Sequence, residues 1–450
     1  MTLHTWESRE IEQLVNAEKG LVDRRIYSDP DIYQLELEHI FARAWNFMCH
    51  ESQIAKPGDF FTNFIGEDRV IAVRDKEGGI QVLLNTCRHR GNAVCRVEDG
   101  HASSFMCTYH GWTYDLKGNL VGVPGYKEFY EESLKREDWG LIKAAKVDSY
   151  NGFVFATLDP EAPPLDEYLG DVGRMGLNVI AQRGEDMAVV DGVQKFVIGC
   201  NWKLAVDNVV DFYHPPLTHA SAMMSAYYRR RATGPGAQGA RSGSAMPSAN
   251  MVVLGEYGHV IGGPMAPPGT PSMFEPAYEA YKERPDAKQA LGPVGLKVNG
   301  HPHVFPNLWV STAGGVSQVD LRLPRGPLST EVWKFTLLDK NLPKETYAAQ
   351  LFRNIHTHGP AGLFEQEDGE NWGESTRGTL GLVSRRFPLN FAMNVGRGEI
   401  IEDELGPPRI ESHVNEHAQL WIYRAWAEWM AARDWRDLKE HHSPAPSGFV

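Results

Sequence analysis

Two cysteines and two histidines are spaced in a way that could bind a metal cluster. Cys87 and His89 form a C-x-H motif, and Cys107 and His110 form a C-x-x-H motif further along the chain. A zinc finger pairs cysteine with cysteine and histidine with histidine, whereas mixed pairs suit a Rieske [2Fe–2S] cluster, in which two cysteines bind one iron and two histidines bind the other. The motifs therefore predict a one-electron redox centre, with a structural zinc site as the alternative. Glycine-rich turns after each motif are expected to bring backbone N–H donors near the sulfurs.

A second group of potential ligands lies in the segment 207–219. Asn208, Asp211 and His214 are three residues apart, which would place them on one face of a helix predicted over 202–214. The double proline after His214 is expected to end this helix, so that the chain can turn and bring His219 to the same centre. Two histidines and one carboxylate make the facial triad that binds ferrous iron and leaves positions open for O2.

The source of that carboxylate stays open on spacing alone. The segment 364–372, FEQEDGENW, lies in a helix predicted over 361–372 and contains four acids, namely Glu365, Glu367, Asp368 and Glu370. By itself it could be a solvated acidic helix. A single histidine is likewise more often a structural residue than a ligand. The interpretation of this segment as a second metal site therefore depends on the presence of the cluster motifs in the same chain.

The composition excludes several classes of protein. The chain has 450 residues, 42% of them hydrophobic, and a formal net charge of −13, which indicates two domains with sizeable cores and argues against sequence-independent nucleic-acid binding. No apolar leader and no run of roughly eighteen apolar residues occurs, so we expect a cytoplasmic protein that does not enter a membrane. The remaining cysteines are expected to be buried reduced thiols: Cys49, Cys95 and Cys200.

Different types of element must position these residues. Two short helices, 10–18 and 31–41, precede a small all-β domain over 42–158 that begins with the strands 59–66, 69–75 and 80–86. The proline-rich segment 159–170 marks its end. The remainder is predicted to contain strands over 192–199, 251–261, 304–311, 319–323 and 332–338, and helices over 344–356, 361–372 and 415–435. The Gly/Ser-rich segment 232–249 is expected to be a loop, either a lid or a plain excursion.

The two cluster motifs resemble those of a known family. CRHRG at 87–91 and CTYHGW at 107–112 are similar to the Rieske boxes in the large (alpha) subunit of the aromatic-ring-hydroxylating oxygenases. The lead-in 24–45 and the segment 201–221 are also similar, and the resemblance extends from about residue 23 to residue 437. Short phrases such as YLGD (168–171) favour the branch that acts on biphenyl, phenylpropionate and polycyclic hydrocarbons.

The resemblance implies an α+β fold and a division of labour between two domains. A Rieske [2Fe–2S] all-β domain (42–158) would be inserted in a helix-grip catalytic domain, an antiparallel sheet held by helices, formed from residues 1–41 and 159–450. Carried over residue by residue, the cluster ligands would be Cys87, His89, Cys107 and His110, and the ligands of the mononuclear iron would be His214, His219 and Asp368.

The same resemblance implies further roles around the iron. Asp211 would link His110 of one chain to His214 of the next, and Asn208 would lie beside it as a second catalytic residue. Asp207 stands where the family commonly has Glu, and Glu367 where Asp is frequent, but neither is expected to touch a ligand. The substrate pocket would be lined by Val209, Phe212, Pro215, Met223, His301, His303 and Phe364. Arg229–Arg231 could pair with a substrate carboxylate, although a solvated run is the simpler reading.

The function implied is that of a terminal oxygenase. NAD(P)H-derived electrons would arrive through a reductase and a ferredoxin, because the chain has no nucleotide-binding motif of its own, and O2 would be used to convert an aromatic ring to a cis-dihydrodiol. The assembly implied is a trimer of alpha subunits, with a small beta subunit added in the favoured branch. A Rieske monooxygenase or demethylase on the same scaffold is the near alternative, and a non-catalytic electron carrier is the distant one.

Overall fold

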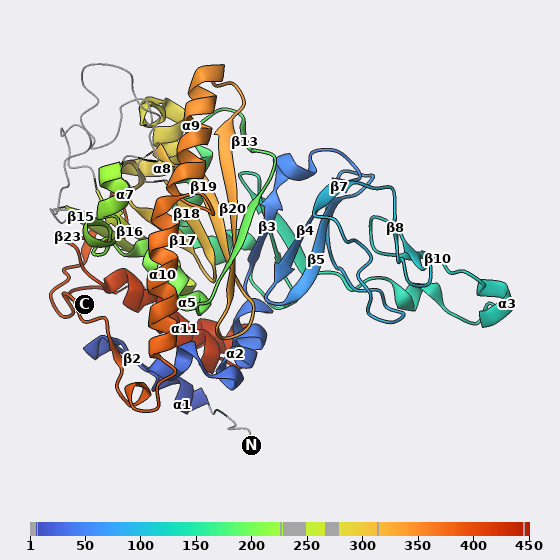
Figure 1. Ribbon diagram of the computed structural model, residues 1–450, viewed down its shortest axis with the longest axis horizontal. Coiled ribbons are helices and arrows are strands. Elements are labelled where there is room, and N and C mark those ends of the chain that lie inside the picture. The colour runs from blue at the N-terminus through green and yellow to red at the C-terminus, as the bar shows by residue number, and fades with distance from the viewer. Residues whose placement is uncertain are drawn as a thin grey trace. The chain divides into compact units, whose positions relative to one another are not determined.

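The chain forms two compact units, one of them inserted in the sequence of the other. The structure, a computed structural model, describes residue 6 and residues 8–225, 227, 249–265, 279–312, 315–443 and 446–450. One unit comprises Met1–Ile40 and Asp166–Val450, and the other is Phe41–Leu165 (Figure 1). The predicted loop 232–249, apart from its last residue, and the arginines 229–231 lie outside the described residues.

The smaller unit is built from three antiparallel sheets. The first has the strand order β11-β12-β3, the second β6-β5-β4-β7 and the third β10-β9-β8. The strands are β3 (Asn46–His50), β4 (Asp59–Ile65), β5 (Asp68–Arg74), β6 (Ile80–Leu84), β7 (Asp99–His101), β8 (Phe105–Met106), β9 (Thr113–Tyr114), β10 (Leu120–Gly122), β11 (Lys146–Tyr150) and β12 (Phe153–Thr157). A single α-helix, α3 (Tyr126–Tyr130), interrupts the described β-structure. Cys87 and Cys107 belong to the core of this unit.

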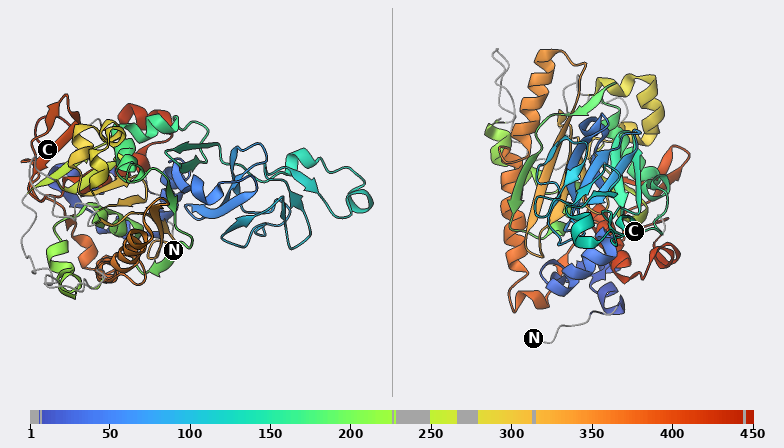
Figure 2. Two further views of the ribbon diagram at one scale, coloured as in Figure 1. Left: turned by 90° about the horizontal axis from the view of Figure 1, so that it is seen from above. Right: turned by 90° about the vertical axis from the view of Figure 1, so that its right-hand side faces the viewer.

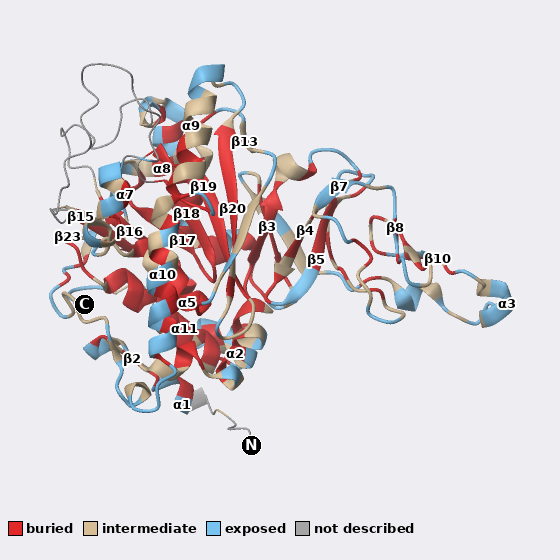
Figure 3. Cartoon of the chain, viewed as in Figure 1, coloured by how far each residue is buried: buried red, intermediate tan, exposed pale blue. Residues whose placement is uncertain are grey.

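The larger unit contains one antiparallel sheet of ten strands, called the main sheet below. Its order is β13-β20-β19-β18-β17-β16-β15-β23-β22, with β14 also paired to β20. The strands are β13 (Met187–Val189), β14 (Gln194–Ile198), β15 (Asn250–Leu254), β16 (Val260–Pro264), β17 (His301–Val304), β18 (Leu308–Ser311), β19 (Gln318–Pro324), β20 (Thr330–Asp339), β22 (Ile401–Asp403) and β23 (Gly406–Ser412). Strands β15 to β19 are buried along their whole length (Figure 3).

Helices cover both faces of the main sheet, as Figure 2 shows from two further directions. One face packs its apolar side chains against α4 (Leu165–Ala181) and α8 (Pro285–Lys297). The other is covered by α5 (Trp202–Asp207), α9 (Lys344–Thr357), α10 (Leu363–Gly378) and α11 (His417–Ala431). The predicted α+β class is confirmed. None of the helices in the described parts of the chain is long and apolar enough to cross a membrane.

Several predicted elements differ in detail. The helix expected over 10–18 is wrong beyond its start, because α1 (Ser8–Glu12) gives way to β1 (Val15–Asn16) and a 3-10 turn. The strand expected over 251–261 is two strands, β15 and β16, separated by a turn in which Tyr257 has a φ of 56°. The C-terminal helix ends at Ala431, and α12 (Trp435–His441) begins after a break.

One buried carboxylate attaches the N-terminal segment to the larger unit. Glu36, in α2 (Pro30–Glu36), is fully buried and accepts hydrogen bonds from the indole N–H groups of Trp202 and Trp426, both at 2.8 Å. The ammonium group of Lys203, also buried, donates to the same carboxylate. Residues from the N-terminus, α5 and α11 therefore meet at a single charged group.

We expect Glu36→Ala to be strongly destabilising. Removing one partner of a buried ion pair leaves the other charge uncompensated, which costs about 3–5 kcal/mol, and two indole donors are left unpaired as well. Urea unfolding followed by tryptophan fluorescence measures the loss. Glu38→Ala, at an exposed position two residues away, is the matched control and should change the free energy of unfolding by less than about 0.5 kcal/mol. Equal effects of the two substitutions would contradict the assignment.

Candidate metal centres

The two cluster motifs lie in turns with the same hydrogen-bond frame. In the first, the Cys87 N–H donates to the carbonyl of Asn92 and the Gly91 N–H to the carbonyl of Cys87, both at 2.8 Å. In the second, Cys107 bonds to the carbonyl of Trp112 at 2.8 Å, and Gly111 to that of Cys107 at 2.9 Å. The glycines have φ values of +73° and +72°, which other residues rarely adopt. The expected turns are present. The N–H groups of these two glycines, however, donate to backbone carbonyl oxygens and not to the cysteine sulfurs.

The side chains of the two turns converge. The rings of His89 and His110 have centroids 4.5 Å apart, and the indole of Trp112 stacks on His89 at 5.0 Å. Burial raises the pKa of Cys107, but the backbone N–H groups of Tyr109 and His110 and the Asn92 amide outweigh it, so that the pKa is lowered. These donors favour a thiolate. Thiolates supported by N–H donors and a pair of neighbouring imidazoles fit the mixed ligand set of a Rieske cluster.

The fit of a cluster is supported by an orphaned atom. Nδ1 of His89 is buried and has no hydrogen-bond partner among the described residues. A buried imidazole nitrogen without a partner is costly unless something else binds it.

None of the five cysteines is in a disulfide, and all are buried, as expected for Cys49, Cys95 and Cys200.

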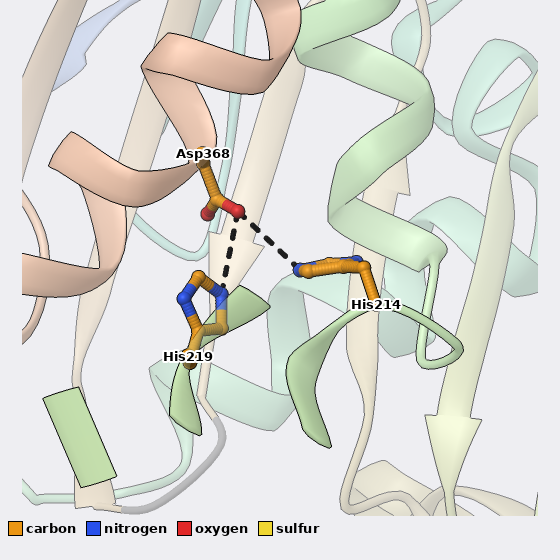
Figure 4. A group of neighbouring side chains, drawn as sticks. All are labelled: His214, His219 and Asp368. Atoms are coloured by element: carbon orange, nitrogen blue, oxygen red, sulfur yellow. Dashed lines mark ion pairs between the residues drawn. The ribbon is translucent and has the colours of Figure 1, made fainter. Parts of the chain in front are cut away.

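In the larger unit, three side chains from two segments of the chain converge on one point. Nε2 of His214 and Nε2 of His219 lie 3.5 and 3.3 Å from the same oxygen, Oδ1 of Asp368 (Figure 4). One ligand atom from each of the three residues lies within 4.8 Å of the others. Oδ1 of Asp368 is buried and makes no hydrogen bond among the described residues. Two imidazoles and one carboxylate in this arrangement fit a divalent iron.

Each of the two imidazoles is hydrogen-bonded to a carboxylate through Nδ1, the ring nitrogen that does not face Asp368. Nδ1 of His214 is 3.0 Å from Oδ2 of Asp211, and Nδ1 of His219 is 3.0 Å from Oε2 of Glu367. We assign Nδ1–H as the donor in both rings, which leaves each Nε2 lone pair directed at Asp368. Burial lowers the pKa of His219 to about 4, so this ring is neutral, as a ligand must be. Burial raises the pKa of Asp368 to about 7, against the opposing effect of His214.

The expectation that Glu367 does not touch a ligand is therefore wrong. Position 367 precedes Asp368 on α10, and its side chain, which is 21% exposed, reaches His219. The hydroxyl of Ser221 also donates to Glu367, which connects α10 to α7 (Ala220–Ser225). Asp207 is buried and accepts a hydrogen bond from Tyr423.

The single helix predicted over 202–214 is also wrong. Helix α5 ends at Asp207, a 3-10 turn follows over Asn208–Val210, and Asp211 is extended, with φ −87° and ψ 120°. The reason is local: a side-chain oxygen of Asp211 accepts from the Tyr213 N–H at 2.7 Å, which competes with the helix. The double proline begins α6 (Pro215–Thr218) instead of ending a helix, since proline is well suited to the first turn. His214 and His219 flank this short helix.

Sequence reasoning missed a set of four buried charges beneath α10. Asp320 in β19 and Lys334 in β20 are paired in the sheet, and their side chains lie 2.6 Å apart. Lys334 also lies 3.0 Å from Glu365, one turn before Asp368, and Glu365 is 3.5 Å from Arg322. All four side chains are at most 1% exposed. These four residues, called the charge quartet, fix the inner face of α10 to the main sheet. The alternation of residues along the strands does not predict that these four charges meet.

Several predicted pocket residues belong to an arc of contacting rings. Consecutive ring centroids lie 4.5 to 6.0 Å apart along the series His219, Phe364, His358, Trp309, His301 and Phe212. The arc starts at one ligand histidine and ends two residues before the other. His358 was not predicted, because it lies in a loop without a motif. Of the other pocket candidates, Val209 and His303 are buried, and Pro215 is the first residue of α6. The N–H of Met223 donates to the carbonyl of His219 at 2.9 Å. The backbone N–H of Asp211 donates to the carbonyl of Asn208, a predicted catalytic residue, at 3.1 Å.

Comparison with known proteins identifies both units. Residues 44–146 match the Rieske [2Fe–2S] domain, and residues 181–432 match the catalytic domain of the ring hydroxylating alpha subunit. The chain is 37% identical over 446 residues to a benzene 1,2-dioxygenase subunit alpha from Pseudomonas putida, with 96% of each chain covered. It is 36% identical to a biphenyl 2,3-dioxygenase subunit alpha from Rhodococcus jostii, covering 96% of this chain and 94% of the relative.

Solved structures agree with this match. A naphthalene 1,2-dioxygenase with indole in its active site superposes with a TM-score of 0.84 at 30% identity, covering 95% of this chain and 96% of that one. A quaternary ammonium Rieske monooxygenase has a TM-score of 0.67 at 18% identity, which indicates a shared fold alone.

We expect Glu367→Ala to weaken iron binding by about 10- to 100-fold, because the His219 imidazole loses the acceptor that orients it. Anaerobic equilibrium dialysis with ferrous iron measures the change in affinity. Glu370→Ala, at an exposed position on the same helix, removes the same charge without touching an imidazole and should leave the affinity unchanged. The role of Glu367 is refuted if both variants bind iron as the unaltered protein does.

Proposed function

The chain belongs to the ring-hydroxylating dioxygenase alpha subunits, and on that premise we propose that it adds both atoms of O2 to one face of an aromatic ring, giving a cis-dihydrodiol. The observation that carries the proposal is the convergence of two imidazole Nε2 atoms and Oδ1 of Asp368 in a chain that also has a Rieske domain. When bound there, a ferrous ion supplies the site at which O2 is activated, and the Rieske cluster supplies electrons one at a time.

Each group of residues then has a defined task. Cys87, His89, Cys107 and His110 would hold the cluster, and His214, His219 and Asp368 the iron. Asp211 and Glu367 orient the two ligand imidazoles by accepting hydrogen bonds from their Nδ1–H groups. The ring arc, with Val209, Pro215 and Met223, would enclose the substrate beside the iron. Asn208 would support Asp211 through its backbone carbonyl.

Asp211 is also suited to connect two chains. Its side chain is 25% exposed although it bonds to His214, and a carboxylate has acceptor sites for about four hydrogen bonds. Two are used, by His214 and by the Tyr213 N–H. The remaining capacity would accept the N–H of His110 of a neighbouring chain, so that electrons pass between subunits of a trimer. A beta subunit, a ferredoxin and an NAD(P)H-dependent reductase would complete the system in the cytoplasm.

A monooxygenase or demethylase remains the second candidate, because the two metal sites would serve it equally. The structural likeness to the quaternary ammonium monooxygenase, at 18% identity, concerns the fold alone and does not favour it. The relatives at 36 to 37% identity are named dioxygenases.

The metal content of anaerobically purified protein tests the proposal first. We expect about three irons and two acid-labile sulfides per chain, with the EPR spectrum of a mixed-ligand [2Fe–2S] cluster after reduction. His214→Ala should remove about one iron and leave the sulfide content and the spectrum unchanged. With a reductase and ferredoxin supplied, benzene, biphenyl or naphthalene should yield a diol in which both oxygens derive from ¹⁸O2. Zinc without sulfide, or a product with a single labelled oxygen, would contradict the dioxygenase assignment.

We expect Asp211→Ala to abolish nearly all turnover while both metal sites can still be filled in excess ferrous iron. The substitution removes the proposed connection between His214 and the neighbouring cluster but none of the ligands. Product formation and metal content are measured on the same sample. Glu367→Ala, loaded in the same way, removes a carboxylate from the other imidazole and should retain more activity. Full activity of Asp211→Ala would exclude the connection.

A further inference from the structure

The inner face of the main sheet beside the ring arc is polar. His303, Trp309, Asp320 and Lys334 are directly paired across β17, β18, β19 and β20, so that their side chains share one face. His301 lies two residues before His303 and therefore on the same face. All five side chains are buried. Asp320 and Lys334 belong to the charge quartet, so His301, His303 and Trp309 are the polar side chains of this row that the quartet does not use.

Several polar atoms of this region have no hydrogen-bond partner in the described parts of the chain. They are Nε1 of Trp309, Oγ of Ser311, Nδ1 of His358 and, apart from a contact with the backbone of Leu308, the ring nitrogens of His303. His303 is 1% exposed, Ser311 is fully buried, and Trp309 and His358 are 5% and 7% exposed. Trp309 joins them, because it is paired with His303 and its ring contacts His358 at 5.1 Å. Buried polar groups in folded proteins normally have partners, since leaving them unpaired is costly.

These atoms suit a neutral polar group rather than an anion. Burial lowers the pKa of His301 and of His303 to about 3, so both imidazoles are uncharged, and each offers one donor and one acceptor. The charged residues beyond Trp309 already balance, because Arg322 and Lys334 face Asp320 and Glu365. Among the described residues of this region, a buried carboxylate would find no cation that is not already in an ion pair.

We propose that this chain selects aromatic substrates that carry a neutral hydrogen-bonding substituent, such as a hydroxyl group, and that His303 and His358 recognise it. The hydroxyl can donate to one imidazole and accept from the other, which satisfies atoms that a bare hydrocarbon leaves unpaired. The ring itself packs against Phe364, Phe212 and Trp309. This inference rests on the proposed function, because it assumes that the ring arc is where the substrate binds.

Binding of three matched probes tests the proposal without turnover. Naphthalene, 2-naphthol and 2-naphthoate share one ring system and carry no polar group, a neutral hydroxyl and a charged carboxylate. Calorimetric titration of the iron-loaded protein under anaerobic conditions should give the highest affinity for 2-naphthol, by about 3- to 10-fold over naphthalene. Equal affinities would mean that water satisfies the buried atoms, and tightest binding of 2-naphthoate would mean that a charge is recognised. Either result overturns the proposal.

Substitutions test the two histidines. His303→Leu and His358→Phe should each lower the ratio of the 2-naphthol affinity to the naphthalene affinity toward one, whereas His303→Asn, which keeps a donor and an acceptor, should retain much of it. His356→Phe is the control, because His356 bonds within its own helix to the carbonyl of Phe352 and should leave the ratio unchanged. An unchanged ratio in both His303→Leu and His358→Phe overturns their assignment.

Two measurements separate this inference from the proposed function. If a bare aromatic ring is oxidised in an O2-dependent reaction but the affinity ratio does not favour 2-naphthol, the function stands and the selectivity is refuted. If none of the rings is oxidised although 2-naphthol binds tightly and depends on His303, the binding site stands and the oxygenase function fails. Should a variant fail to fold, the ranking of the three probes on the unaltered protein decides the proposal by itself.

Discussion

The arrangement of the proposed iron site depends on one constraint, which is that each proposed ligand imidazole must keep a free nitrogen. A neutral imidazole has one N–H group, and in both His214 and His219 it is used by a carboxylate behind the ring. The other nitrogen then has to face Asp368, whose Oδ1 has no competing hydrogen bond among the described residues. The short helix between the histidines and the position of α10 can be understood as means of satisfying this requirement.

The charge quartet extends the same constraint into the main sheet. Glu365 lies one turn before Asp368, and its contacts with Lys334 and Arg322 fix the rotation of α10 about its axis. A helix that turned by one residue would move Asp368 away from the imidazoles and bring a neighbouring acid into its place. Burying charged groups costs desolvation free energy. In this protein the buried charges also fix the orientation of Asp368.

The sequence allowed much of this organisation to be predicted, and the failures have physical causes. Cys87, His89, Cys107 and His110 could be recognised as candidate ligands because metal ligands repeat at short spacings. The strands predicted over 59–66 and 69–75 were found as β4 and β5 for a similar local reason. The helix over 202–214 failed because a side chain, that of Asp211, competes with the backbone for a hydrogen bond. Glu365, Lys334 and His358 were not found in their roles, because their partners are far away in the chain and only the fold brings them together.

The position of Glu36 has a consequence for how the protein is synthesised. Its carboxylate is bonded by Trp202 and by Trp426, near the end of the chain. On the ribosome, the larger unit therefore cannot complete its core until the last helices have emerged. The inserted unit has all its strands within Phe41–Leu165 and can fold long before that, as domains generally do during translation. The redox domain would then be finished while the oxygenase domain that needs its electrons is still an open chain.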